Sequence, residues 1–539
     1  MNGDNKLMGY EEYLDKVKQM IDDLKAMTAD LGLANTGDEY KIISELFTYK
    51  FLNDKLLYNF EHREDIEDSF DDFIDFADSN TARIKEEYLL LNLFQKQNDK
   101  KFHKTFDKAL EAISELNKDV YSIETSTGTK KPLFEPLSVY LRDPDKEVEL
   151  AKRAINILCK YQFGGEIFEQ GWDYFSSIFE YLIKDYNKDS GKYAEYYTPA
   201  FAGAIMANIL YNDTPVDQVE IYDPAAGSGT LLLSMATKVG AKNCTIYSQD
   251  RSQKSTQFLR INLILNNLAQ SLEYVIEGNT MTNPMHLEGD RLKRFDFIVS
   301  NPPFTVDFSA DVETMKTDKY GRFFAGIPSI PPKKKNDMAI YLTFLQHILA
   351  SLKEDGKAAV VVPNGFLTFN SGIQKKIRKE IVDNNWLRGV VSMPSNIFAT
   401  TGTSVSIIFI DKSRNNEDEI ILIDATKIGR KVSLEDGQRT ILSTEDERFI
   451  ISTFNNKVLV EDFSVLVTKE DIQGRNYSFL AGQYYPTKMV YIPISEEEYE
   501  NNINKLRLDI NNLFDESKEL DKQIRVILEE LKYDRVKKI

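Results

Sequence analysis

The chain has 539 residues, of which 42% are hydrophobic and 28% charged, and its formal net charge is −18. This length predicts three or more domains, and the composition is that of a soluble globular protein. The acidic balance excludes a chain whose whole surface grips DNA, because phosphate binding needs a basic face. If nucleic acid is the substrate, the basic surface must be local or must come from a partner.

The sequence shows no targeting, membrane or metal signal. The start, "MNGDNKLMGY", lacks a secretory pattern, and the apolar runs are too short to cross a bilayer. Cys159 and Cys244 lie far apart in apolar segments, and the four histidines form no metal-binding pattern. His347, in "YLTFLQHILASL", is expected on a helix surface rather than as a ligand. We therefore expect a cytoplasmic protein without a metal ion.

Residues 1–190 are expected to form a helical N-terminal domain. Apolar residues recur at three- and four-residue spacing in "EEYLDKVKQMIDDLKAMTADLGL" and in "SIFEYLIKDYNKDSGKY". The acidic stretch "EHREDIEDSFDDFIDFADSN" is interpreted as a solvated helical face, in preference to a specific docking surface.

Residues 191–490 are expected to form an α/β domain. Strand-like runs such as "VEIYD", "CTIYSQD", "FDFIVS" and "KAAVVVP" alternate with helical stretches, which predicts a mostly parallel, Rossmann-like sheet with helices on both faces. The runs "LRGVVSM" and "TSVSIIFID" are joined by a short loop that contains Gly402. This spacing indicates a hairpin, and hence an antiparallel strand at the sheet edge.

Residues 491–539 contain a long heptad helix. Ile503, Leu506, Ile510, Leu513, Ser517, Leu520, Ile524, Ile527 and Leu531 follow one another in steps of three and four, and Ser517 alone is polar. An amphipathic helix packed on its own chain would show a similar stripe. The length and regularity favour a helix that contacts another chain or domain.

A glycine-rich turn indicates a nucleoside-binding site. "VEIYDPAAGSGTLLLSMA" passes from a strand through Gly227 and Gly229 into a helix, whose N-terminal amides favour a bound ligand. A dinucleotide fingerprint would have a third glycine where Leu232 stands, and Asp223 would repel a pyrophosphate. The next strand ends in Asp250, where a carboxylate can bind a ribose diol. An adenosine with an amino-acid tail and no phosphate, S-adenosylmethionine, fits these features.

Two further segments flank that turn. Asn279, in "EGNTM", either reaches the adenine ring or is a simple loop residue. In "AEYYTPAFAGAIMANIL", Thr198 is expected to be the N-cap and Pro199 the first residue of a helix. Capping does not explain Tyr196 and Tyr197, which can close over a cofactor.

The run "DFIVSNPPF" ends a strand with groups suited to an amine. The side-chain carbonyl of Asn301 and the backbone carbonyl of Pro302 can each accept one N–H, which favours positive charge developing on that nitrogen. Proline keeps the backbone rigid and offers no competing N–H. Phe304 offers a flat surface for a planar base, which must be flipped out of a duplex to reach it.

The motifs "YYTP", "DPAAGSGTLL" and "SNPPF", in this order, resemble N6-adenine DNA methyltransferases of the gamma arrangement, and especially methylation subunits of type I restriction–modification systems. The segments 336–367 and 402–411 and the terminal helix also resemble that family. The resemblance implies that Asn301, Pro302, Pro303 and Phe304 are catalytic. It implies that S-adenosylmethionine is bound by Glu195, Tyr196, Tyr197, Thr198, Pro199, Asp223, Ala225, Ala226, Gly227, Ser228, Gly229, Asp250 and Asn279. The family commonly has Glu where Asp250 stands, and either carboxylate can hold a ribose.

The resemblance also implies partners. Type I methylation subunits leave sequence reading to a specificity subunit, around which two copies pack, and the terminal heptads are expected to contact it. This agrees with the acidic charge and with the short stretch between residue 411 and the heptads. The resemblance further implies that a nuclease–translocase subunit joins in the restriction complex. This chain shows no Walker A sequence, so it would not itself supply ATP hydrolysis.

The segment 305–336 is a long connection rich in glycine, proline and lysine. The segment either orders over flipped DNA, with Lys333, Lys334 and Lys335 near phosphates, or is a solvated basic loop.

Related motifs also serve N4-cytosine, ribosomal RNA guanine and protein glutamine methylation. A solitary methyltransferase would bind DNA specifically without a partner. A non-catalytic assembly scaffold would bind no cofactor. The presence of Asp223 argues against a scaffold, because a scaffold has no need for a charged residue at the cofactor turn.

Overall fold

The computed structural model describes residues 4–34, 36–63, 69–125, 128–141, 143–163, 168, 198–211, 217–397, 404–415, 419–434, 437–486 and 495–530. The chain divides into two compact units, Met1–Tyr485 and Pro486–Ile539. The domain boundaries expected at 190/191 and 490/491 lie outside the described residues.

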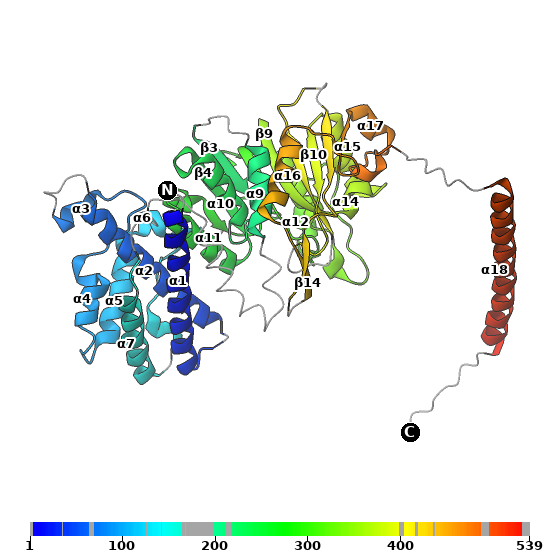
Figure 1. Ribbon diagram of the computed structural model, residues 1–539. Coiled ribbons are helices and arrows are strands. Elements are labelled where there is room, and N and C mark those ends of the chain that lie inside the picture. The colour runs from blue at the N-terminus through cyan, green and yellow to red at the C-terminus, as the bar shows by residue number, and fades with distance from the viewer. Residues whose placement is uncertain are drawn as a thin grey trace. The chain divides into compact units, whose positions relative to one another are not determined.

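The first unit begins with a group of helices (Figure 1), as the sequence predicts for its first stretch. They are α1 (Asp4–Asp30), α2 (Gly37–Glu61), α3 (Phe70–Phe76), α4 (Leu90–Gln95), α5 (Phe102–Leu116), α6 (Lys118–Tyr121) and α7 (Pro144–Lys160). The Thr36 side chain accepts the Glu39 amide at the start of α2, and Pro144 follows the capping Asp143 at α7. The predicted helix over 177–193 lies outside the described residues.

The central sheet has the strand order β15-β12-β10-β11-β9-β8-β3-β4-β5-β1-β2 in the described part of the chain. Its strands are β1 (Ile123–Thr125), β2 (Lys130–Lys131), β3 (Val219–Asp223), β4 (Cys244–Asp250), β5 (Val275–Glu277), β8 (Phe295–Ser300), β9 (Leu352–Pro363), β10 (Leu387–Ser392), β11 (Val405–Asp411), β12 (Ile420–Asp424) and β15 (Ser464–Val467). Two small hairpins are β6 (Leu287–Glu288) with β7 (Arg291–Leu292), and β13 (Arg430–Leu434) with β14 (Gly437–Ile441).

The expected mostly parallel sheet is confirmed, with two differences in detail. The predicted hairpin forms, since β10 pairs antiparallel with β11, but β11 also pairs antiparallel with β9 and so lies inside the sheet. The antiparallel edge strands are β15 and β2, because β12 and β15 continue the sheet beyond β10. The helical N-terminal part also supplies β1, which pairs parallel with β5. These pairings join segments far apart in the chain and have no local signal.

Helices cover both faces of the sheet (Figure 1). Alternate strand residues face opposite ways, so Ile221 and Val361 belong to one apolar cluster and Tyr222 and Val360 to the other. The first face is covered by α9 (Ala200–Leu210), α10 (Thr230–Val239), α11 (Gln253–Leu265) and α16 (Thr444–Asn455). The second is covered by α13 (Tyr341–Ala350), α14 (Gly365–Thr368), α15 (Gly372–Asp383) and α17 (Lys469–Gly474).

The second unit contains one long helix, α18 (Glu496–Glu530), which confirms the helix predicted from the heptads as far as residue 530. Its apolar side chains are exposed: Leu506, Leu508, Ile510, Leu513, Phe514, Leu520, Ile524, Val526, Ile527 and Leu528. Among the helices of the described residues, none combines the length and apolar character that crossing a membrane requires.

Candidate active site

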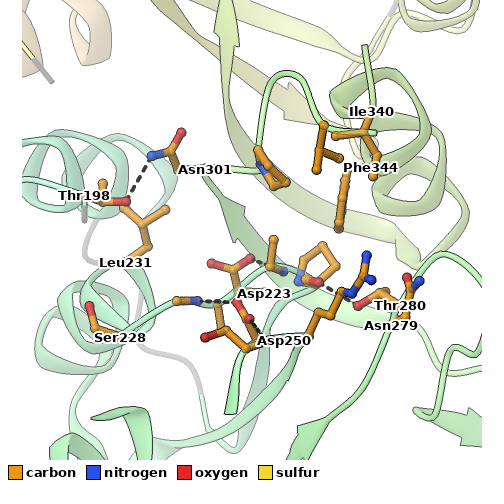
Figure 2. A pocket seen from close by; sticks show the side chains of 18 of the residues that line it. Thr198, Asp223, Ser228, Leu231, Asp250, Asn279, Thr280, Asn301, Ile340 and Phe344 are labelled. Carbon is orange, nitrogen blue, oxygen red and sulfur yellow. Dashed lines mark hydrogen bonds between the residues drawn. The ribbon is translucent and has the colours of Figure 1, made fainter. Parts of the chain in front are cut away.

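A cavity of about 500 Å³ lies beyond the carboxyl ends of β3, β4, β5 and β8, where ligands of open α/β sheets bind. Figure 2 shows Asp223 and Asp250 near its middle, Asn301 and Thr198 to one side, and Asn279 and Thr280 to the opposite side. Further lining residues are Pro224, Ala225, Ala226, Gly227, Ser228, Thr230, Leu231, Arg251, Ser252, Pro303, Val306, Asp307, Asp311, Ile340 and Phe344.

The glycine turn forms one wall, and its glycines are required by the geometry. Gly227 and Gly229 have φ angles of 54° and 88°, in the left-handed region that favours glycine. A Cβ at Gly229 would lie 2.2 Å from Cδ1 of Leu259 on α11. The side-chain amide of Asn262, also on α11, donates to the backbone carbonyl of Ser228 at 2.7 Å. The same helix packs Phe258 edge-to-face against Tyr40 of α2, with ring centroids 4.6 Å apart.

Two carboxylates are held in place by backbone amides. Asp223, only 2% exposed, accepts the Ala225 amide at 2.9 Å and the Ser300 hydroxyl at 2.8 Å. Asp250 accepts the Gly227 amide at 2.8 Å and the Ser252 amide at 2.7 Å. Burial, together with the charge of Asp250, raises the pKa of Asp223 to about 8, and burial also raises the pKa of Asp250. Two adjacent buried carboxylates favour a ligand that brings positive charge and hydroxyl donors.

Asn301 is anchored from outside its own strand. Its Nδ2 donates to the Thr198 hydroxyl at 3.1 Å, which leaves Oδ1 as the acceptor of that side chain. The predicted capping role of Thr198 is therefore wrong. Pro199 is the N-cap of α9 and makes no side-chain capping bond, and the Thr198 hydroxyl faces Asn301 instead.

The rest of the "NPPF" motif occupies different environments. Pro302 is buried, whereas Pro303 is exposed and lines the cavity. Phe304 is half-buried and lies edge-to-face to Tyr341 of α13, with ring centroids 6.4 Å apart. Phe304 is not part of the cavity wall, so its predicted base-stacking surface would lie beside the cavity rather than within it.

The segment 305–336 is packed onto the sheet domain rather than being a free loop. It contains α12 (Val312–Lys316), and its Phe308, Val312 and Met315 form an apolar cluster with Met281 and Phe344. Its Arg322, 2% exposed, forms an ion pair with Asp318 at 2.8 Å and donates to the backbone carbonyls of Thr280 and Met281. Lys333, Lys334 and Lys335 are exposed.

His347 of α13 is buried, contrary to the predicted surface position. Its Nε2 lies 3.1 Å from the Tyr222 hydroxyl, and its Nδ1 lies 3.3 Å from Nη1 of Arg322. Burial and the neighbouring Arg322 charge hold the pKa of His347 well below its usual range, so the ring is neutral. The apolar residues around it do not reveal this polar network, because its partners come from β3 and from the segment 305–336.

The structure thus brings most of the predicted site residues to one cavity. Those that line it are Thr198, Asp223, Ala225, Ala226, Gly227, Ser228, Asp250, Asn279, Asn301 and Pro303. Pro199 and Gly229 adjoin it in the chain, and Glu195, Tyr196 and Tyr197 lie outside the described residues. Sequence reasoning missed Asp311, since an acidic residue in a long loop carries no signal of its position. The described part of the chain holds no cluster of metal-ligating side chains.

Comparisons with known proteins define the class to which this fold and site belong. A family model described as N-6 DNA Methylase matches residues 170–491, more than half of the chain. The chain therefore belongs to the N-6 DNA methylase family.

Individual proteins similar to this chain are methylase subunits of type I restriction enzymes. The methylase subunit of the type I restriction enzyme MpnII of Mycoplasma pneumoniae is 27% identical over 372 residues, which is 67% of this chain and 65% of that protein. The chain thus spans just under two thirds of that relative. The type I restriction enzyme MjaVIII methylase subunit of Methanocaldococcus jannaschii is 24% identical, over 96% of this chain and 86% of the relative.

Solved structures support the same fold. The methyltransferase subunit of a type I restriction-modification system from Streptococcus thermophilus superposes with a TM-score of 0.66 at 20% identity, covering 88% of this chain and 100% of that one. A modification subunit of a putative type I restriction enzyme from Vibrio vulnificus gives a TM-score of 0.57 at 17% identity, over 88% and 97% of the two chains.

Proposed function

We propose that this chain is the methylase subunit of a type I restriction–modification system, and that the cavity beyond β3, β4, β5 and β8 is its methyl-transfer site. The observation that carries the proposal is the position of Asn301. It directly follows β8, whose last residue, Ser300, donates to Asp223 of the adjacent strand β3, and its amide is oriented by Thr198. The amine-accepting group and the cofactor-binding turn therefore share one cavity.

The residues of the cavity fit S-adenosylmethionine, which supplies the electrophilic methyl group when bound. Asp223 is buried and has a raised pKa, and a cationic amino-acid tail would favour its ionised form and so gain a negatively charged partner. Asp250, fixed by the Gly227 and Ser252 amides, is placed to accept ribose hydroxyls. Val306, Ile340 and Phe344 supply an apolar surface for a ring. No phosphate site is needed, in agreement with the carboxylate at the start of the turn.

Asn301 acts on the target amine. The lone pair of an exocyclic adenine amine is delocalised into the ring, so the amine is a poor nucleophile. Acceptance of its hydrogens by Oδ1 of Asn301 and the Pro302 carbonyl favours the pyramidal, more nucleophilic nitrogen and the positive charge that develops on it. Because Thr198 binds Nδ2 of Asn301, the amide presents Oδ1 rather than a donor. Placement of the reacting groups supplies the rest of the rate, and the base must be flipped out of the duplex.

The assembly follows from the relatives and from α18. Type I methylase subunits work with specificity and restriction subunits and with DNA, and we assign the exposed apolar side of α18 to the specificity subunit. Its apolar side chains are exposed, as a partner-binding surface requires, and the net charge of −18 favours DNA reading by another chain. Two copies of this chain per specificity subunit complete the proposed complex.

The experiment compares methyl transfer from labelled S-adenosylmethionine to DNA by the chain alone and by the chain with its co-encoded specificity subunit. Product analysis separates N6-methyladenine from N4-methylcytosine and methylglutamine. Asn301→Ala is expected to lower the rate about 100-fold or more without loss of folding, as for removal of a transition-state hydrogen bond. The matched control is Asn384→Ala, at the exposed end of α15 and far from the motif in sequence.

The outcomes separate the candidate functions. Activity only in the mixture, lost with Asn301→Ala and kept with Asn384→Ala, supports the proposal. Site-specific activity of the chain alone would mean that it reads DNA itself, and the assignment of α18 would then be abandoned. An intact complex that binds no cofactor would make the chain an assembly scaffold.

A further inference from the structure

We infer that Asp311, in the segment that follows the catalytic motif, is a second adenine-reading residue of the cofactor site and pairs with Asn279 to recognise the 6-amino group and N1 of the cofactor adenine. This inference rests on the proposed function, because it specifies how the same cavity selects its cofactor. It assigns a role to a residue that no motif contains.

The first observation concerns how Asn279 is used. Its Oδ1 accepts the Met281 amide at 3.0 Å, and its Nδ2 donates to Oδ2 of Asp311 at 3.1 Å. The side-chain carbonyl of Asn279 is therefore occupied within its own loop. Asn279 then offers the cavity the second hydrogen on Nδ2, which is a donor, while its Oδ1 already accepts a backbone amide and keeps one of its two lone pairs.

The second observation concerns Asp311. It stands at the N-cap of α12, where an aspartate usually accepts an amide of its own helix, but it makes no such capping bond. Its carboxylate instead reaches across to Asn279 and lines the cavity, and within the described residues no hydrogen bond to its Oδ1 is present. Asp311 thus supplies a charged acceptor without a partner on Oδ1, next to the Asn279 donor.

The chemistry of the pair matches one ring edge. Adenine presents a donor, its 6-amino group, directly beside an acceptor, N1. The Asp311 carboxylate and the Asn279 amide present an acceptor beside a donor, joined to each other by their own hydrogen bond. The deaminated ring, hypoxanthine, has an acceptor at position 6 and a donor at N1, so the same pair would oppose it at both positions.

The third observation shows that the pair is held rigidly. Arg322 and Asp311 belong to the same segment, and Arg322 donates to the Thr280 carbonyl at 2.9 Å and to the Met281 carbonyl at 2.7 Å. The Thr280 hydroxyl in turn donates to the Pro224 carbonyl of the glycine turn at 2.7 Å. The loop that carries Asn279 is therefore fixed on one side to the segment 305–336 and on the other to the cofactor turn.

The test measures binding of S-adenosylhomocysteine and of S-inosylhomocysteine, its deaminated analogue, to the purified full chain by calorimetry. The wild-type chain is expected to prefer the adenine ligand. Asp311→Asn is expected to weaken binding of the adenine ligand about tenfold or more, as for loss of a charge-assisted hydrogen bond. The same variant should leave the deaminated ligand unchanged or bind it more tightly, since the new amide can donate to its 6-oxygen.

The control is Glu313→Gln, which removes the same charge from the same segment. Glu313 is exposed, pairs with Lys316 at 2.8 Å and does not line the cavity, so the preference between the two ligands should be that of the wild type. Equal losses for both ligands in Asp311→Asn, or an unchanged preference, would overturn the inference while the proposed function stands. A wild-type chain that binds neither ligand would overturn both.

Discussion

The sheet domain buries charged groups in and beside its cavity, whereas α18 exposes apolar ones. Asp223 and Arg322 are each 2% exposed and are bound by amides, hydroxyls, carbonyls or an opposite charge. Leu513 and Leu520 of α18 are 63% and 56% exposed. The difference teaches that the buried charges are stabilised by groups of this chain, while α18 leaves exposed the apolar side chains that we have assigned to the specificity subunit.

The largest expected effect is a loss of folding stability when the buried Arg322 interactions are removed. Arg322→Ala leaves Asp318 without its ion partner and the Thr280 and Met281 carbonyls without their donor. Removing one partner of a buried ion pair costs about 3–5 kcal/mol of folding free energy. Chemical denaturation should show this loss, and Lys319→Ala, an exposed position in the same segment, should change it by less than about 0.5 kcal/mol. Equal stability of the two variants would show that the pocket does not depend on this network.

The next effect is a pH dependence of folding stability and of S-adenosylmethionine affinity, which Asp223 causes. In the folded chain the pKa of Asp223 is raised to about 8, so the folded state holds a proton that the unfolded chain releases near the ordinary value of 3.8. Stability of the ligand-free chain should therefore fall as pH rises between about 4 and 8. Affinity for S-adenosylmethionine should rise towards pH 8, by up to about tenfold per pH unit, because the cation favours the ionised carboxylate.

Asp223→Asn should remove the part of the pH dependence of folding stability and of cofactor affinity that the Asp223 carboxyl causes. Calorimetry in buffers of pH 6, 7 and 8 measures the affinity. A wild-type affinity that does not change with pH would contradict the raised pKa.

A smaller effect is expected at the Thr198–Asn301 bond. Thr198→Val removes the hydroxyl at nearly constant volume, so Nδ2 of Asn301 loses its acceptor and the amide is less well oriented. The turnover number should fall about two- to tenfold, the value of one neutral hydrogen bond, with little change in affinity for DNA. Thr198→Ser keeps the hydroxyl and should retain the wild-type rate. Equal rates for Val and Ser would remove Thr198 from the positioning of Asn301.

The smallest effect on the isolated chain is expected from α18. The double variant Leu513→Glu, Leu520→Glu should leave the melting temperature of the isolated chain almost unchanged, because both side chains are already exposed. The same change at Leu345, which is fully buried on α13, should prevent folding. Pull-down with the specificity subunit should be lost in the α18 variant. Retained binding would place the partner surface elsewhere.

The sequence was informative where one short segment carries the whole signal. The strand–turn–helix pattern around Gly227 and Gly229 and the strand that stops before Asn301 predicted that both segments lie at one sheet edge, and both line the cavity there. Both predictions need only local pattern and the rule that carboxyl ends of parallel strands meet.

What the sequence did not predict depends on contacts between distant segments. Thr198 has the residue type of a helix cap, but its hydroxyl is taken by Asn301, more than 100 positions along the chain. His347 sits in an amphipathic-looking run, but Tyr222 and Arg322 surround it. Asp311 gains its position from a bond to Asn279. In each case a polar side chain is satisfied across the fold, and spacing along the sequence cannot show with which partner.

The close packing of Gly229 against Leu259 has a consequence for how this protein can change in evolution. A side chain at position 229 and a leucine at position 259 would occupy the same space, so position 229 can be enlarged only if residue 259 becomes smaller and the backbone leaves its left-handed conformation. Leu259 lies beside Phe258, which packs on Tyr40 of α2, so mutational drift in the helical N-terminal part is coupled to the cofactor turn through α11. Relatives that enlarge position 229 should therefore carry a smaller residue at 259.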